Sequence, residues 1–273
     1  MLTFAPNVSW LFPELPFKER PGAATKAGFS AIEFGFPSHA DLEALEAARS
    51  DLGLQIVLFN QDVPVWDRAN RGYLVDPGRR SEFRRTLDAA LEIARRLAVQ
   101  KVMLPAGVKL DGLPFEKQRE CMVENLQYAA PLAAQAGVLL TIEALNPHDN
   151  PGYFLTTTIQ GVDIVKSVNH PQVRFQFDTY HIQRMEGRLL TQIEEQAEWI
   201  GHFQFADYPG RHEPGTGDID FTSILQAIER VGYHGVIGLE YIPLATGASA
   251  LEWVPPALLN KNPYLWQEKK KHD

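Results

Sequence analysis

Three carboxylates and one amide stand at corresponding positions near the ends of four short, apolar-rich segments: Glu143, Asp178, Gln204 and Glu240. Carboxylates gathered at one spot repel one another unless a positive charge lies between them. Two Glu, one Asp and an amide oxygen form an all-oxygen ligand set, which favours Mg²⁺ or Mn²⁺ over zinc. The residue types therefore predict a divalent metal site.

Alternation along these segments indicates which way their side chains point. Apolar residues such as Ile142, Phe177 and Phe205 alternate with the polar ones. In a barrel of parallel strands, one alternating set faces the helices and the other faces the lumen. Because helices pack on the apolar set, the polar set is predicted to point inward. Its last members then lie at the carboxyl ends of the strands, where barrel enzymes hold their active sites.

The alternative is that these are lumen residues paired only with Arg174, His202 or backbone groups. Three carboxylates at neighbouring strand ends argue against it, because a buried unpaired charge is costly. Asp207 lies one residue past the inward-facing position of its segment. We therefore prefer Gln204 to Asp207 as a ligand.

Other polar residues follow the same or equivalent segments. His181 comes three residues after Asp178 in a predicted loop, and it is a candidate contact for substrate or metal. Arg211 follows the seventh segment, and its guanidinium suits a bidentate pair with a substrate carboxylate. Glu33 and Asn60 also fall at segment ends, where we expect them to hydrogen-bond loop backbone.

The elements that must position these residues alternate between short strand-like and longer helical segments. The predicted strands are residues 3–7, 31–34, 55–60, 101–104, 138–143, 174–178, 202–206 and 236–240. The predicted helices are residues 18–27, 41–52, 79–97, 115–136, 158–168, 189–199 and 221–231. Glycines 28, 53, 137, 201 and 232 are predicted helix stops.

The eighth strand ends at residue 240, which gives about 30 residues per unit, the size of a βα repeat in a (β/α)₈ barrel. A doubly wound sheet is the rival architecture, but residues 7–10 do not form the glycine-rich phosphate loop that usually follows its first strand. We expect a catalytic α/β domain, a single (β/α)₈ TIM barrel, over residues 1–240. Residues 241–273 are expected to form an irregular tail that packs on the barrel or on a partner.

Composition narrows the possible partners. The 273 residues include 34 acidic and 26 basic ones, and a formal net charge of −8 argues against nucleic acid. The lone cysteine, Cys121, rules out an internal disulfide and is typical of a reducing compartment. No apolar run approaches the ~18 residues of a membrane span, and residues 1–11 lack the charge pattern of a leader. We expect a cytoplasmic protein that binds a small molecule, with a homo-oligomer as one possible state.

Three longer strings resemble the hydroxypyruvate isomerase family of the xylose-isomerase-like barrels: TIEALN at 141–146, FDTYHIQRMEG at 177–187 and GHFQFADYPGRHEPGTG at 201–217. Shorter matches at 7–12, 29–34 and 238–241 extend the resemblance over nearly all of residues 1–243. The resemblance implies interconversion of hydroxypyruvate and 2-hydroxy-3-oxopropanoate (tartronate semialdehyde), with Glu143 and Glu240 as the proton-transfer pair. In the wider superfamily, the residues that match Glu143, Asp178, Gln204 and Glu240 bind a divalent metal. Those that match His181 and Arg211 contact substrate.

The chemistry of such a reaction agrees with the residues. Moving a carbonyl to the next carbon requires removal of a proton beside it and return of a proton next door, through an enediolate. The nearest alternative is an isomerase of a four-carbon 2-oxo sugar acid (2-oxo-tetronate), followed by a ketose 3-epimerase. Gln204 disfavours the epimerase, because it stands where many sugar epimerases have a metal-binding histidine.

Two alternatives from other functional classes are disfavoured. A phosphodiesterase like endonuclease IV would gather histidines around several zinc ions. A non-catalytic sugar-acid binder would not need glutamates on both the fifth and the eighth strand.

Overall fold

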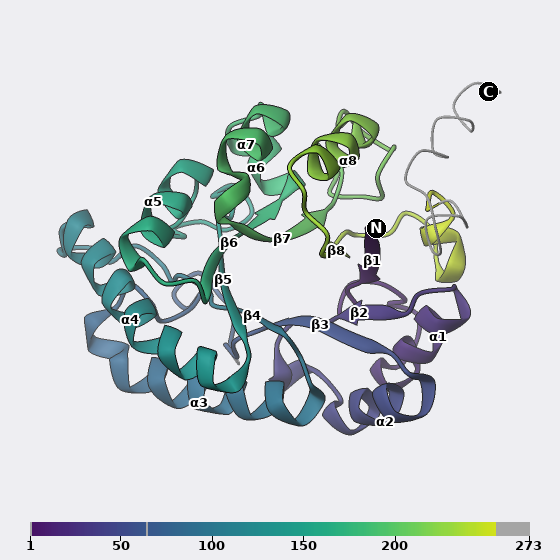
Figure 1. Cartoon of the computed structure of the whole chain (residues 1–273), viewed down its shortest axis with the longest axis horizontal. Helices are drawn as coiled ribbons and strands as arrows, with labels where there is room; N and C mark the ends of the chain where they lie inside the picture. The colour runs from purple at the N-terminus through teal and green to yellow at the C-terminus, as the bar shows by residue number, and fades with distance from the viewer. Residues whose placement is uncertain (1, 64, 255–273) are drawn as a thin grey trace.

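Eight parallel strands form the centre of the computed structural model, which describes residues 2–63 and 65–254 (Figure 1). The strands are β1 (Thr3–Pro6), β2 (Ala31–Glu33), β3 (Gln55–Asn60), β4 (Lys101–Met103), β5 (Leu139–Glu143), β6 (Val173–Asp178), β7 (Ile200–Phe205) and β8 (Val236–Leu239). Hydrogen-bonded neighbours follow the order β1-β8-β7-β6-β5-β4-β3-β2. A parallel bridge between Asn7 and Glu33 brings β1 and β2 together. The result is a nearly closed, single (β/α)₈ barrel, as predicted.

Helices follow the strands along the chain and surround the ring (Figure 1). The α-helices are α1 (Arg20–Lys26), α2 (Leu42–Leu52), α3 (Arg80–Leu97), α4 (Phe115–Ala136), α5 (Thr158–Val168), α6 (Thr179–Met185), α7 (Leu189–Gln196) and α8 (Phe221–Arg230). Short 3₁₀ turns are η1 (Phe17–Glu19), η2 (Pro37–His39), η3 (Pro77–Arg79), η4 (Ala197–Trp199) and η5 (Gly247–Leu251). The prediction lacked α6, and it contained the other seven α-helices to within a few residues.

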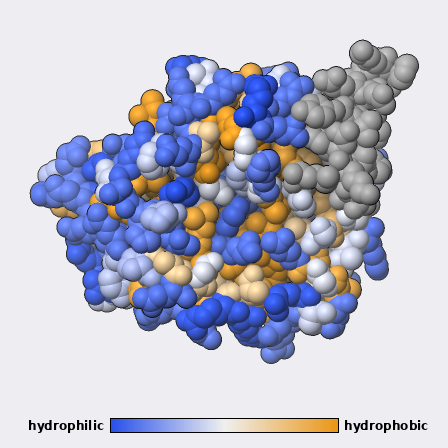
Figure 2. Space-filling model, viewed as in Figure 1, coloured by the Kyte–Doolittle hydropathy of each residue, from blue (hydrophilic) through white to orange (hydrophobic). Residues whose placement is uncertain are grey.

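Apolar periodicity explains how the two layers pack. Helix α3 buries Phe83, Leu87 and Leu91, which recur every four residues along one face. Strands β6 and β7 turn their phenylalanines toward this helical layer, where Phe177 and Phe203 lie with ring centroids 5.5 Å apart. Figure 2 shows the complementary surface, where hydrophilic residues dominate the periphery and hydrophobic ones show mainly in the recesses between them. No helix in residues 2–63 and 65–254 is long and apolar enough to cross a membrane.

Gly201 has a different role from the predicted one. Gly28, Gly53, Gly137 and Gly232 have positive φ beside helix ends, as expected of helix stops. Gly201 instead lies within β7, where an added Cβ would lie 2.5 Å from Cβ of Arg174 in the neighbouring strand. Glycine is needed there for close approach, so its prediction as a helix stop is wrong.

The first part of the expected tail packs on the barrel. Tyr241 is buried and donates its hydroxyl to the carbonyl of Ala250 at 2.7 Å. The indole of Trp253 donates to the Tyr241 hydroxyl, and its ring lies 5.8 Å from that of Phe4 in β1. Residues 255–273 of the expected tail lie outside the described residues.

Candidate active site

The carboxyl ends of β5 to β8 bring the four predicted metal ligands together. Glu143 ends β5, Asp178 ends β6, Gln204 lies one residue before the end of β7, and Glu240 directly follows β8. The strand register pairs Asp178 with Gln204, and Gln204 with Gly238. Glu143, Asp178 and Gln204 are at most 4% exposed. The inward orientation expected from alternation therefore places these polar groups in one buried layer.

Glu143 and Asp178 form the part of this layer best suited to a cation. One ligand atom from each, with one from His181, lies within 4.8 Å of the others. Oε1 of Glu143 and Oδ2 of Asp178 are buried and have no hydrogen-bond partner in the described part of the chain. Burial, Asp178 and Glu240 raise the pKa of Glu143 well above its ordinary value, and burial raises the pKa of Asp178 to about 7. Two unpartnered buried carboxylate oxygens fit a divalent cation, whose charge offsets theirs.

Helix α6 presents His181, so the expectation of a loop after Asp178 is wrong. Oδ1 of Asp178 accepts the backbone N–H groups of Tyr180 and His181 and thereby caps the helix. A seven-residue helix is too short to show a clear hydrophobic period, which is why the pattern did not indicate it. The same cap leaves only Oδ2 of Asp178 without a hydrogen bond.

The surroundings of His181 fix its tautomer. Its Nδ1 accepts the backbone N–H of Asn146 at 3.2 Å, and the Asn146 side-chain nitrogen lies 2.8 Å away. Burial, with the charges of Arg211 and Arg184, lowers the pKa of His181 well below its ordinary value. A neutral imidazole that accepts at Nδ1 carries its proton on Nε2. His181 is therefore a neutral hydrogen-bond donor.

Two buried amides connect the two glutamates. Gln176 Nε2 donates to Glu143 Oε2 at 3.1 Å and to Gln204 Oε1 at 2.8 Å. Gln204 Nε2 donates to Glu240 Oε2 at 2.9 Å. Oε2 of each glutamate thus accepts a hydrogen bond from a glutamine amide, whereas Oε1 of each does not take part in this bridge. In this orientation the oxygen of Gln204 accepts from Gln176, and ligation of a metal by Gln204 stays a prediction.

A second buried acid lies next to these amides. Glu33 accepts from Gln204 Nε2 at 2.9 Å and lies 2.5 Å from His202 Nε2, while Lys101 Nζ lies 3.1 Å from His202 Nδ1. Burial raises the pKa of Glu33 to about 8 and lowers that of Lys101 to about 8. The expectation that Glu33 bonds to loop backbone is wrong, because its chain neighbours Ile32 and Phe34 pack in the main hydrophobic core and Glu33 points the other way, into the lumen.

Gly238 in β8 makes room for Glu33. An added Cβ there would lie 2.4–2.6 Å from the Glu33 carboxyl atoms. We expect Gly238→Ala to lower the free energy of unfolding by about 1–3 kcal/mol, and to lower kcat because Glu33 no longer holds Gln204 in place. Urea denaturation and steady-state kinetics measure the two effects. Gly22→Ala in α1 is the control, because nothing lies within 4 Å of its added Cβ. If the two variants behave alike, the packing around Glu33 does not matter as described.

Arg211 lies between two carboxylates of the site. Its Nη2 donates to Glu240 Oε1 at 2.8 Å and lies 3.8 Å from Asp178 Oδ2. Its guanidinium also lies over the ring of Trp10, 4.6 Å from the ring centre. The positive charge of Arg211 is thus shared by acids of the protein itself. Its predicted contact with substrate stays a prediction.

A cavity of about 660 Å³ opens at these strand ends. Glu143, His181, Arg211 and Glu240 line it, together with the aromatic residues Trp10, Phe17, Phe36 and Trp66 and the polar residues Asn60, Arg71, Asp149 and Asn150. Asp178 and Gln204 lie behind this lining, in contact with Arg211 and Glu240 respectively. The cavity therefore has the mixed apolar and polar wall of a small-molecule site.

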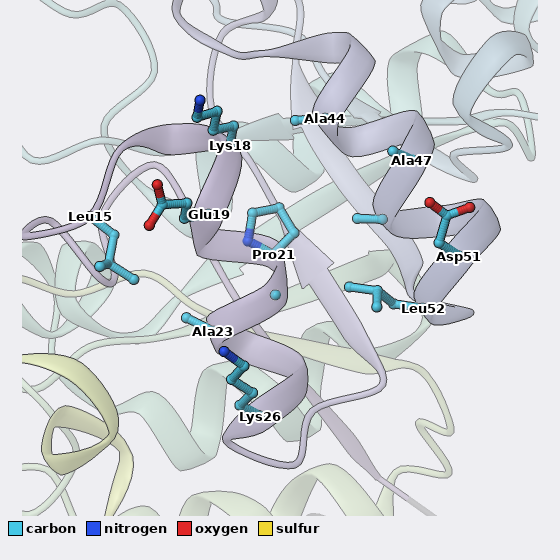
Figure 3. A pocket seen from close by; sticks show the side chains of 12 residues that line it. Leu15, Lys18, Glu19, Pro21, Ala23, Lys26, Ala44, Ala47, Asp51 and Leu52 are labelled. Atoms are coloured by element: carbon cyan, nitrogen blue, oxygen red, sulfur yellow. The ribbon is translucent and has the colours of Figure 1, made fainter.

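A second hollow, of about 710 Å³, lies on the outer layer between α1 and α2 (Figure 3). Alanine and aliphatic side chains such as Ala44, Ala47 and Leu52 form much of its wall. It lacks the converging buried acids of the strand ends. The strand-end cavity is therefore the candidate active site.

Several residues of the site were not singled out from the sequence. Gln176 shared the inward face of its segment with Asp178, so alternation already carried the signal for it. Lys101 is the first residue of β4 and is half-buried by packing between distant segments, which no local sequence pattern reveals. Arg71 lies in the irregular stretch between β3 and α3, where hydrophobic period carries no information.

Comparisons with known proteins agree with this architecture. The model of the family described as "Xylose isomerase-like TIM barrel" matches residues 21–256. Hydroxypyruvate isomerase of Escherichia coli (strain K12) is 38% identical over 94% of this chain and 99% of its own length. A 2-oxo-tetronate isomerase of Cupriavidus necator is 36% identical over 94% of this chain and 99% of its own length. The crystal structure of an AP endonuclease, family 2, from Brucella melitensis is 37% identical, with a TM-score of 0.89, over 93% of this chain and 98% of that one.

Proposed function

Because the chain belongs to the xylose isomerase-like TIM barrel family and, within it, to the hydroxypyruvate isomerase family, we propose that it interconverts hydroxypyruvate and 2-hydroxy-3-oxopropanoate. One observation connects membership of this family to the proposed reaction. Glu143 and Glu240 come from strands β5 and β8, line one cavity, and are bridged by two amides that leave Oε1 of each outside the bridge. Paired carboxylates in one cavity suit proton removal and proton return.

The reaction needs two proton transfers that balance. A glutamate removes a proton from C3 of hydroxypyruvate, which gives an enediolate spanning C2 and C3. A proton then adds to C2, and the O3 hydroxyl loses its proton as C3 becomes the aldehyde, while O2 gains one. One glutamate takes the proton in its ionised form and the other returns a proton in its protonated form. Either glutamate serves as base, according to the reaction direction and substrate pose.

Other residues of this chain assist the transfers. The neutral Nε2–H of His181 donates to a substrate oxygen, and Arg211 keeps Glu240 oriented. We propose Mg²⁺ or Mn²⁺ as the cation, held by Glu143, Asp178 and Glu240 with Gln204. When bound, it supplies the positive charge that stabilises the negative charge of the enediolate.

A four-carbon 2-oxo sugar acid is the second candidate substrate. The 36% identity to a 2-oxo-tetronate isomerase supports it, and a cavity of about 660 Å³ exceeds the volume of a three-carbon acid. Endonuclease chemistry, suggested by the name of the Brucella structure, has less support. In residues 2–63 and 65–254, the candidate metal group contains one histidine and two acids rather than many histidines.

We also propose that the enzyme works in the cytoplasm. Its lone cysteine, Cys121, is free and buried in α4. A buried thiol without a disulfide agrees with a reducing compartment. Fractionation of the source cells checks this proposal.

Substrate ranking tests the function. Purified protein with added Mg²⁺ is incubated with hydroxypyruvate, four-carbon 2-oxo acids and ketoses, and kcat/KM is compared. We expect the two acid classes to exceed every ketose by at least tenfold, with hydroxypyruvate first. A ketose that reacts fastest overturns the sugar-acid assignment, and a four-carbon acid that reacts fastest selects the second candidate.

A further inference from the structure

Arg71 lines the same cavity from the stretch between β3 and α3. It is 6% exposed; its guanidinium lies 5.2 Å from the ring centre of Trp66, and its Nη1 donates to Oδ1 of Asn150. Its Nε is buried without a hydrogen-bond partner among the residues described. Within residues 2–63 and 65–254, Arg71 forms no ion pair with a carboxylate. A buried cation with an unused donor therefore faces a cavity proposed to take an anion.

The backbone beside Arg71 is held firmly in place. Gly72 forms an antiparallel bridge with Ala106, in the connection that follows β4. Its φ is +117°, and an added Cβ would lie 2.1 Å from the carbonyl oxygen of Pro105. Only glycine fits such a position. The bridge from Gly72 to Ala106 thus joins the stretch that carries Arg71 to the connection after β4, and it holds the backbone beside Arg71 in one position.

The cavity has two other arginines, and both are engaged by the protein. Arg211 shares its charge with Glu240 and Asp178. Arg20 is half-buried and donates to the backbone carbonyls of Leu15, Val8 and Ser9. Arg211 Nε is also buried without a hydrogen-bond partner in the described part of the chain, but Arg211 is ion-paired with these two acids. Among the residues described, Arg71 is therefore the buried arginine of this cavity that forms no ion pair with a carboxylate.

We propose that Arg71, rather than Arg211, binds the carboxylate of the substrate. This inference rests on the proposed function and specifies its substrate class as short 2-oxo or 2-hydroxy acids. Nη1 is occupied by Asn150, so the edge formed by Nε and Nη2 receives the two carboxylate oxygens side by side. The acids Glu143 and Glu240 repel a carboxylate placed beside them. The substrate therefore lies with its carboxylate at Arg71 and its reacting carbons toward the glutamates.

Equilibrium binding tests this assignment without turnover. Isothermal titration of the full-length, Mg²⁺-supplemented protein compares glycerate with glyceramide, its uncharged counterpart. In Arg71→Met we expect glycerate affinity to fall about 10- to 150-fold, while glyceramide affinity changes less than threefold. Arg71→Lys keeps the charge but not the two-pronged edge, and it is expected to lose at least tenfold for glycerate. Arg68→Met removes a charge from an exposed position of the same stretch and is the control.

Other results overturn the assignment. Arg71→Met and Arg71→Lys proteins that still prefer glycerate as strongly as the wild type contradict it, especially if Arg211→Lys loses the preference. A wild type that binds glycerate no better than glyceramide contradicts it too. If Arg71→Met does not fold, as judged by its thermal midpoint, the Arg71→Lys comparison decides. If the protein converts no sugar acid but shows the expected binding pattern, the proposed reaction is wrong and the assignment of the carboxylate site to Arg71 is supported.

Discussion

Glu143→Gln and Glu240→Gln are each expected to lower kcat for hydroxypyruvate by about 10²- to 10⁴-fold. Glutamine keeps the size of the side chain but neither removes nor returns a proton. KM is expected to change less than tenfold, because the anchoring groups of the cavity remain. Stopped assays of product formation over a range of hydroxypyruvate concentrations measure kcat and KM.

A surface carboxylate provides the control for these variants. Glu194 pairs with Arg230 at 2.9 Å on the outer helical layer, so Glu194→Gln changes charge without touching the cavity. It is expected to keep wild-type kcat. Glu240 also accepts from Asn7 and Arg211, and its variant therefore needs a thermal midpoint to show that it folds. A folded Glu240→Gln protein that binds ligand and still turns over at the wild-type rate contradicts the mechanism.

Removal of divalent cations is expected to reduce activity at least 100-fold, and Mg²⁺ or Mn²⁺ should restore it. The reason is the pair of buried oxygens on Glu143 and Asp178 that have no hydrogen-bond partner among the described residues. Binding should also stabilise the fold, by about 2.7 kcal/mol at a free metal concentration 100 times Kd. Activity after EDTA treatment and thermal midpoints with and without metal provide the measurements. Full activity in metal-free protein refutes the metal role.

The same loss of metal should change how stability depends on pH. The pKa of Asp178 is about 7 in the fold because burial disfavours its charged form, against about 4 in an unfolded chain. The folded state thus holds this proton more tightly, so metal-free stability falls as pH rises from about 4 to about 7. The cation offsets the charge and should flatten this fall. In Asp178→Asn both the fall and the stabilisation by metal should shrink, and Glu33, Glu143 and Glu240, whose pKa values are also raised, account for the fall that remains. If both effects are undiminished, Asp178 is not their source.

Alternation and repeat length were sufficient to predict the barrel. The alternation of Phe175, Phe177 and their polar neighbours is imposed by the two faces of a barrel strand, so it is legible in one segment at a time. The same rule placed Glu143, Asp178 and Glu240 at the carboxyl ends of β5, β6 and β8. It also applied to Glu33, where a three-residue strand gave too little pattern to outweigh a loop interpretation.

The remaining features depend on packing between distant segments. Helix α6 begins because Asp178 caps it, and a single cap followed by seven residues resembles a loop in sequence. Gly201 is required by a contact with the neighbouring strand, which looks the same in sequence as a helix stop. Arg71 becomes part of the cavity only because its stretch is bridged to the connection after β4. Such contacts between distant segments leave no pattern in the local sequence, and they determine which groups line the site.

Turnover of hydroxypyruvate in deuterated water tests the central claim most directly. Proton transfer by Glu143 and Glu240 through an enediolate predicts 2-hydroxy-3-oxopropanoate with deuterium at C2, because a proton held by a glutamate exchanges with solvent between removal and return. Nuclear magnetic resonance of the product, with the Glu194→Gln protein as a matched control, reports the label. Product that carries no deuterium at C2 indicates direct hydride transfer between the carbons and contradicts the account.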